Sequence, residues 1–271
     1  DAATEDLHLP TGFGPHRGVA VYGERVETGT LNGTLLALER ASGATVFEVE
    51  TLSPQITGAP LTARGVVVVG LSWIDRGAVQ AFDAETGEEL WTWYTLPSPE
   101  DGGWWGEWIE HVPGQPDVSL GRDIAQEKAD SARLADTWRT GGGSAPMTPT
   151  FDPARGLVFV SVVGPDPTAF PPPAEPHPGD MRWTNSTCAL RLETGEVAWC
   201  YQVLPHDIWG ASGPTPNFLF EMETDDGVRE AVARFSGMGQ LYVWDREGEL
   251  LRVSDNYIPV EETRAGGTGP T

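Results

Sequence analysis

The chain has 271 residues, 33 of them glycine and 23 proline, and its 40 acidic against 17 basic side chains give a net charge of −23. This length can bury a substantial core, and the glycine and proline content with many short apolar runs favours an all-β fold over a helical one. A field of this sign makes nucleic acid and anionic membrane surfaces poor partners, and no apolar run is long enough to cross a membrane as a helix.

The basic residues other than histidine are all arginine except Lys128. A solvated acidic surface suited to saline surroundings explains this balance, and steering of a basic partner, such as a cationic electron-transfer protein, is the alternative. The chain begins at Asp1, on an acidic stretch and without methionine. That start is typical of a processed terminus or of a fragment.

One hairpin pattern recurs four times, as an apolar alternating run, a polar turn that ends in glycine, and a second apolar run. The turn glycines are Gly43, Gly87, Gly195 and Gly248. Side chains of period two on both arms, with glycine where a turn needs positive φ, indicate β-hairpins. Two of the spacings are close to the ~40–50 residues of one propeller blade. The longest spacing therefore predicts an insertion.

Short apolar runs before each hairpin supply two further strands, so each unit predicts the four strands of a blade. We expect one domain over residues 1–271, with blades at about 16–52, 53–97, 144–204 and 212–254. The remaining segments are a Trp- and Gly-rich insertion at 98–143 and an irregular tail at 255–271.

Within the insertion, residues 124–136 predict a short amphipathic helix. Clustered tryptophans at Trp104, Trp105 and Trp108 are typical of anchors that pack a long loop onto its own domain, with ligand stacking or partner binding as the alternative.

Both cysteines, Cys188 and Cys200, lie on the arms of the third hairpin, at matching distances from its turn. Cross-strand neighbours are close enough for a disulfide, so we expect a bridge and a periplasmic or extracellular location. Two small buried thiols are the alternative. No CxxCH motif is present, which argues against a covalently attached c-type haem.

Nine short stretches, among them PHDIW at 205–209 and YVWDR at 242–246, occur in a recognisable order along the chain. The other seven are 16–20, 56–60, 81–87, 141–144, 151–153, 178–180 and 184–186. Together they resemble the quinoprotein alcohol dehydrogenases, the pyrroloquinoline-quinone (PQQ) enzymes related to methanol dehydrogenase. The resemblance implies an eight-bladed propeller with PQQ and a calcium or lanthanide ion near its axis, of which this chain supplies a consecutive half.

The resemblance also places the family's functional positions on this sequence. The metal-binding glutamate falls on Ser72, the metal-binding asparagine on Gly164, the catalytic aspartate (also a metal position) on Gly210, the tryptophan that stacks on PQQ on Pro146, and the basic residue that touches the quinone on Gly237. A calcium site needs carboxylate oxygens, and a dehydrogenase needs a general base that glycine cannot supply. Asp207 is a rival base, but we expect it to keep a structural role. We therefore expect no catalytic residue, no bound PQQ and no metal.

Two functions follow as hypotheses. The favoured one is a quinoprotein-like propeller subunit that acts as a scaffold or interaction module in an extracytoplasmic complex. The alternative is a PQQ-dependent alcohol or sugar dehydrogenase, with PQQ and calcium, whose site residues come from another register or another chain. Because a half ring leaves two blade faces uncovered, we also expect a second protein chain that completes the propeller, a homodimer, or a longer chain of which this is a fragment.

Overall fold

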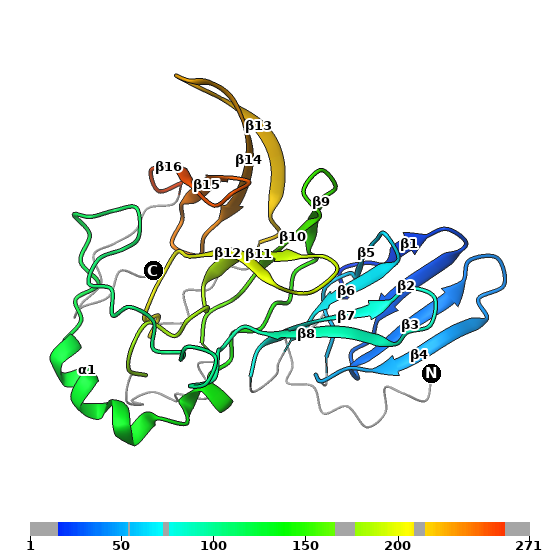
Figure 1. The fold of residues 1–271 in the computed structure, drawn as a ribbon, viewed down its shortest axis with the longest axis horizontal. Helices are drawn as coiled ribbons and strands as arrows, with labels where there is room; N and C mark the ends of the chain where they lie inside the picture. Colours follow the sequence, from blue (N-terminus) through cyan, green and yellow to red (C-terminus); the bar gives the residue numbers. More distant parts are fainter. Residues whose placement is uncertain (1–15, 54, 73–75, 166–176, 209–214, 258–271) are drawn as a thin grey trace.

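Sixteen strands build four antiparallel four-stranded sheets in the part of the chain that the computed structural model describes, residues 16–53, 55–72, 76–165, 177–208 and 215–257. Each sheet keeps its strands in chain order, so every strand pairs with the one that follows it. Figure 1 shows the sheets following one another from β1–β4 at the N-terminal end to β13–β16 at the other. The predicted all-β fold with four blades is confirmed, and the described blades do not close into a ring.

The first sheet contains β1 (Ala20–Tyr22), β2 (Arg25–Gly29), β3 (Thr34–Glu39) and β4 (Thr45–Glu50). The second contains β5 (Leu61–Ala63), β6 (Val66–Gly70), β7 (Ala78–Asp83) and β8 (Glu89–Tyr94). The third contains β9 (Thr150–Asp152), β10 (Leu157–Ser161), β11 (Ser186–Arg191) and β12 (Val197–Gln202). The fourth contains β13 (Phe218–Thr224), β14 (Gly227–Phe235), β15 (Leu241–Asp245) and β16 (Leu250–Val253).

Burial along the strands follows the position of each sheet in the stack. Every residue of β6 and of β10 is buried, because the second and third sheets are covered on both faces. β4 of the first sheet alternates more, with Phe47 buried and its neighbours Val46 and Glu48 exposed. The first strands of consecutive sheets contact one another, β1 with β5, β5 with β9 and β9 with β13. The sheets are thus arranged around the side on which these first strands meet, as blades are around a propeller axis.

An aromatic side chain four residues after the turn glycine docks each sheet onto the next one. Trp91 donates from Nε1 to the carbonyl of Leu192 at 2.9 Å and its ring lies against the turn at Gly195. Trp199 repeats the contact with the carbonyl of Arg246, also at 2.9 Å. A Cβ on Gly195, which has φ +70°, would lie 2.6 Å from the Trp91 ring, so this turn accepts only glycine.

The two ends of the stack lack this contact in the described part of the chain. Gly43, the turn glycine of the first sheet, has nothing within 4 Å of the place where a Cβ would be. In the fourth sheet the docking position is Arg252, which is exposed. Large apolar side chains are exposed on both outer sheets, namely Val19, Val21 and Val46 on or beside the first and Phe218, Phe235 and Tyr257 on or beside the fourth.

The insertion between the second and third sheets contains α1 (Ile124–Asp130) and two short 3-10 helices, η2 (Ser131–Leu134) and η3 (Thr137–Arg139). The predicted helix is therefore confirmed, but its α-helical part ends at Asp130. Trp104 is fully buried and packs with Leu96, Trp138 and Met181. It stacks on Trp105 with ring centroids 4.0 Å apart, so the tryptophans form the insertion's own core. None of the described helices is long and apolar enough to span a membrane.

Candidate functional site

Of the family positions singled out from the sequence, the four in the described residues lie in loops at one end of the blades: Ser72, Pro146, Gly164 and Gly237. In an up-and-down sheet, the loop after the second strand and the link to the next blade emerge at the same end. Three segments meet there, because Ala145 N donates to Leu71 O and Val163 N donates to Ser144 O, both at 2.9 Å.

Ser72 and Pro146 are brought together by Thr57. The Thr57 hydroxyl lies 2.8 Å from the Ser72 hydroxyl and 3.4 Å from the Pro146 carbonyl oxygen. The Ser72 carbonyl also accepts a hydrogen bond from Ser53. Ser72 is 1% exposed, so its hydroxyl is a buried, neutral group that already has a partner.

Gly164 lies beside these segments, and its carbonyl accepts from Gly143 N at 3.3 Å. Asp207 is connected to the same region through Asn185, whose backbone N donates to Val163 O at 3.0 Å. The Asn185 amide donates to Asp207 Oδ2 at 2.8 Å, and both residues are buried. Asp207 therefore orders two loops through its hydrogen bonds, which agrees with a structural role.

Gly237 lies in the loop between β14 and β15, and no backbone hydrogen bond among the described residues joins it to Ser72, Pro146 or Gly164. Gly210 lies outside the described residues. The structure thus brings together three of the five family positions.

These positions do not fit a PQQ and calcium site as the family builds it. Ser72 offers one neutral hydroxyl, and Gly164 offers only backbone atoms, whereas calcium needs carboxylate charge. Within the described ranges, no group of three or more His, Cys, Asp or Glu side chains is placed to hold a metal. The chemistry available here is hydrogen bonding by hydroxyl, amide and backbone groups.

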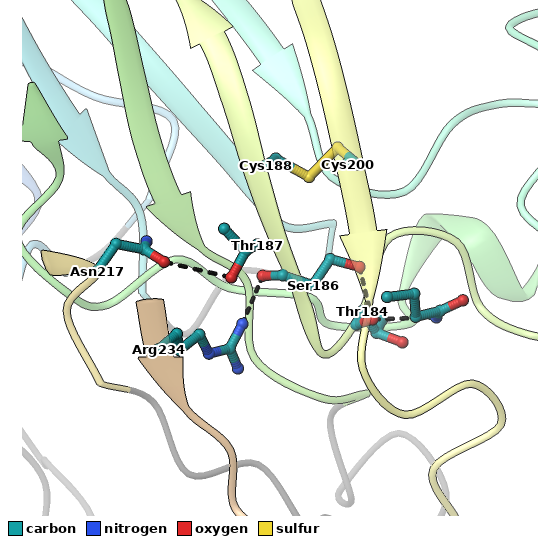
Figure 2. The surroundings of a disulfide bond; sticks show 8 residues. Thr184, Ser186, Thr187, Cys188, Cys200, Asn217 and Arg234 are labelled. Atoms are coloured by element: carbon teal, nitrogen blue, oxygen red, sulfur yellow. Dashed lines mark hydrogen bonds between the residues drawn. A yellow bond between two sulfur atoms is a disulfide. The ribbon is translucent and has the colours of Figure 1, made fainter. Parts of the chain in front are cut away.

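The predicted disulfide is confirmed. Cys188 on β11 lies opposite Cys200 on β12, and the two sulfur atoms are bonded with the Cα atoms 4.1 Å apart. Figure 2 shows the bridge between these two strands, with Ser186 and Thr187 at the start of β11 beside it. Cys188 is fully buried and packs in the cluster that joins the second and third sheets.

A buried charged network, which the sequence did not reveal, lies beside the candidate site. Arg122 of the insertion donates to Asp180 at 2.5 Å and to Glu127 at 2.6 and 2.9 Å. Asp180 also accepts from the backbone N atoms of Glu107, Trp108 and Ile109, at 2.7 to 3.0 Å. Asp180 thus holds the insertion against the third blade. The sequence offered one sign of this network: Arg122 and Glu127 are only five residues apart, in an acid-rich stretch.

Two histidines complete this network. The His206 ring lies 3.5 Å from Glu127 and packs edge-on against the His177 ring, with centroids 4.8 Å apart. Burial lowers the pKa of His177 well below its usual value, and the neighbouring His206 lowers it further. Burial and then the Arg122 charge lower the pKa of His206. Both rings are therefore neutral near pH 7, and they serve as packing and hydrogen-bonding groups.

Four antiparallel four-stranded sheets, docked through aromatic residues on glycine turns, define a β-propeller class of protein. Residues 16–270 match the family model "PQQ: Glucose/ethanol/alcohol dehydrogenase, beta-propeller domain". The chain belongs to this PQQ dehydrogenase propeller family.

Curated relatives support the assignment. Quinohemoprotein alcohol dehydrogenase ADH IIB of Pseudomonas putida is 31% identical over 245 residues, which cover 87% of this chain and 33% of the relative. The putative dehydrogenase XoxF of Paracoccus denitrificans is 30% identical, over 93% of this chain and 41% of the relative. The chain thus spans about a third of the length of its first matching relatives.

Solved structures agree with the sequence matches. Quinohemoprotein alcohol dehydrogenase ADHIIG from Pseudomonas putida superposes with a TM-score of 0.70 at 29% identity, covering 90% of this chain and 35% of that one. The enzyme from Comamonas testosteroni also gives 0.70, at 26% identity, over 94% of this chain and 38% of that one. These fractions of the solved chains, 35% and 38%, are consistent with the interpretation of this chain as about half of a propeller ring.

Proposed function

We propose that this chain is a non-catalytic quinoprotein-like subunit, a scaffold or interaction module in an extracytoplasmic complex, without PQQ or metal of its own. One observation carries the proposal. Where the resemblance places a metal-binding glutamate, Ser72 is buried and its hydroxyl is bonded to Thr57. The neighbouring positions, Pro146 and Gly164, add neither charge nor a base.

The partner that we propose is a second protein chain, or a second copy of this one, that supplies the missing blades. Exposed apolar side chains on both outer sheets support this, since blades bury their apolar faces only against neighbours. A longer chain of which these blades are one part would satisfy the same faces from within.

We place the complex in the periplasm or outside the cell. The Cys188–Cys200 disulfide supports this location, because structural disulfides persist in oxidising compartments. Fractionation of the producing cells, with an antibody to the chain, tests it.

A second candidate is a PQQ-dependent alcohol or sugar dehydrogenase. The names of the relatives favour it, since they are quinohemoprotein alcohol dehydrogenases. Under this hypothesis PQQ supplies the two-electron oxidation when bound, and its ligands come from residues outside the four blades. A base and the metal-binding carboxylates would have to come from there as well.

The two candidates are separated by titrating the native particle, purified from the producing cells together with any chain bound to it, with PQQ and calcium, following tryptophan fluorescence and dye reduction with ethanol or glucose. The apo form of the Pseudomonas putida ADH IIB enzyme is the positive control. We expect no saturable PQQ binding and no turnover. Stoichiometric PQQ uptake with calcium-dependent dye reduction would overturn the scaffold proposal.

A further inference from the structure

Arg234 is a buried arginine on β14, between the third and fourth sheets. It is 1% exposed. Val232, two residues before it and so on the same face of the strand, packs in the cluster that joins these two sheets. Nη1 of Arg234 donates to the carbonyl oxygen of Ser186 at 2.5 Å, as Figure 2 shows.

One edge of this guanidinium is unpaired. Nε–H and one N–H of Nη2 point in the same direction and form the edge that holds both oxygens of a carboxylate. In the described part of the chain, Nε has no hydrogen-bond partner, and the bond from Nη1 to Ser186 is the one that the side chain makes.

Other buried arginines in the molecule are matched by acids. Arg122 pairs with Asp180 and Glu127, and Arg246 pairs with Asp152 at 2.8 Å. No described carboxylate forms such a pair with Arg234, and burial lowers its pKa to about 10. A buried guanidinium without a counter-charge is strongly unfavourable, and the described residues supply no anion for it.

The neutral groups around Arg234 are already paired with one another. Asn217 donates to the Ser161 hydroxyl at 3.0 Å, Thr187 donates to Asn217 Oδ1 at 3.2 Å, and Ser161 donates to Thr215 O at 2.6 Å. Figure 2 shows Asn217 and Thr187 on one side of the Arg234 guanidinium. These groups form a polar wall, and none of them compensates the charge of Arg234.

We propose that the Nε and Nη2 edge of Arg234 binds the carboxylate of a small organic acid at the contact between the third and fourth sheets. A carboxylate matches this edge because it is planar, accepts two parallel hydrogen bonds and carries the single negative charge that balances one guanidinium. A doubly charged phosphate or sulfate would leave excess charge in a buried place. Arg234 is none of the five family positions, and the proposal needs neither PQQ nor a metal to be bound.

The test uses the whole chain and acetate as the probe, with chloride at equal ionic strength as the reference. Isothermal titration and the melting temperature are measured for the parent protein and for Arg234→Lys, Arg234→Met and Arg229→Gln. Arg229 lies on the same strand but is half-buried and paired with two acids, the buried Asp245 and the exposed Glu249, so its variant is the matched control.

We expect saturable acetate binding that raises the melting temperature of the parent and of Arg229→Gln. Arg234→Lys keeps a charge but loses the two-pronged edge, so acetate should bind at least about tenfold more weakly. Arg234→Met should show no acetate binding and no rise in melting temperature with acetate. If the methionine variant does not fold, the comparison of Arg234→Lys with the parent tests the proposal by itself. Equal acetate effects in all four proteins, or none in the parent, would overturn the proposal. So would an acetate-free crystal structure in which an Asp or Glu side chain fills this edge.

Discussion

Glu27 on β2 is fully buried between the first and second sheets, and its carboxyl group has few hydrogen-bond partners. Its Oε2 accepts from the Thr62 hydroxyl at 3.4 Å, and Oε1 has no hydrogen-bond partner in the described residues. Burial raises the pKa of this carboxyl, and the Thr62 bond offsets the effect only in part. The protonated form is therefore favoured in the folded protein relative to the unfolded chain.

This shift predicts the direction of a pH effect. A raised pKa contributes stability that is present at low pH and lost as pH rises through the folded-state value. Glu27→Gln should therefore raise the melting temperature at pH 7 by about 2–4 °C and flatten its dependence on pH. Thermal scans from pH 4 to pH 8 measure this, with the exposed Glu48→Gln as control. A lower melting temperature at pH 7 with an unchanged pH slope would contradict this account of Glu27.

Asp180 is also a buried carboxylate, but unlike Glu27 both of its oxygens accept hydrogen bonds. Asp180→Ala leaves Arg122 and three backbone N–H groups without their acceptor. We expect the free energy of unfolding to fall by about 3–5 kcal/mol in urea titrations. Asp136→Ala removes only an exposed pair with Arg139 and should change it by less than about 0.5 kcal/mol. A loss below about 1 kcal/mol for Asp180→Ala would mean that the network does not hold the insertion.

At the scale of elements, the repeated hairpin and its docking aromatic explain how one sheet finds the next. Trp199→Ala removes a partly buried ring that covers Gly248 and donates to Arg246 O. The free energy of unfolding should fall by about 3 kcal/mol, and Trp199→Phe should lose about 1 kcal/mol because it keeps the packing. Leu90→Ala, at an exposed position on β8, is the control and should have little effect. Equal losses for the two Trp199 variants would assign the whole effect to the hydrogen bond.

The disulfide also acts at the scale of elements, because it joins two neighbouring strands. The Cys188–Cys200 bond closes a short loop across the third hairpin, with a sequence separation of 12. Reduction should lower the free energy of unfolding by about 2–3 kcal/mol in urea titrations, because the loop gains entropy in the unfolded chain. The reductant should not change the free energy of unfolding of the Cys188→Ala/Cys200→Ala double variant. A response of the double variant would mean that the reductant acts elsewhere.

The sequence predicted the parts of the fold that depend on local pattern. The alternating arms and the turn at Gly195 place Cys188 opposite Cys200 without any knowledge of the rest of the chain. The network of Arg122, Asp180 and Glu127 could not be predicted in this way, because Asp180 lies 58 residues from Arg122 in the chain. Arg234 offered a weak signal, since an arginine sits on the same strand face as Val232, where an apolar residue belongs.

At the scale of the whole molecule, the described residues form four docked blades that do not close into a ring, with apolar side chains exposed on both outer sheets. Val21 on the first sheet and Phe218 on the fourth are 59% and 39% exposed, although both lie on strands beside the axis. Stacked repeats with such faces require neighbours or caps. The central claim is therefore that this chain works as part of a larger ring and holds no PQQ or metal within its four blades.

Native mass spectrometry of the purified particle, after incubation with PQQ and calcium and under salt gentle enough to keep non-covalent partners, tests this claim most directly. The account predicts a complex with a second chain, or a dimer of this one, without added cofactor mass. A species that carries the mass of PQQ and a divalent ion would contradict the non-catalytic proposal. A bare monomer of 29.2 kDa would contradict the half-ring itself.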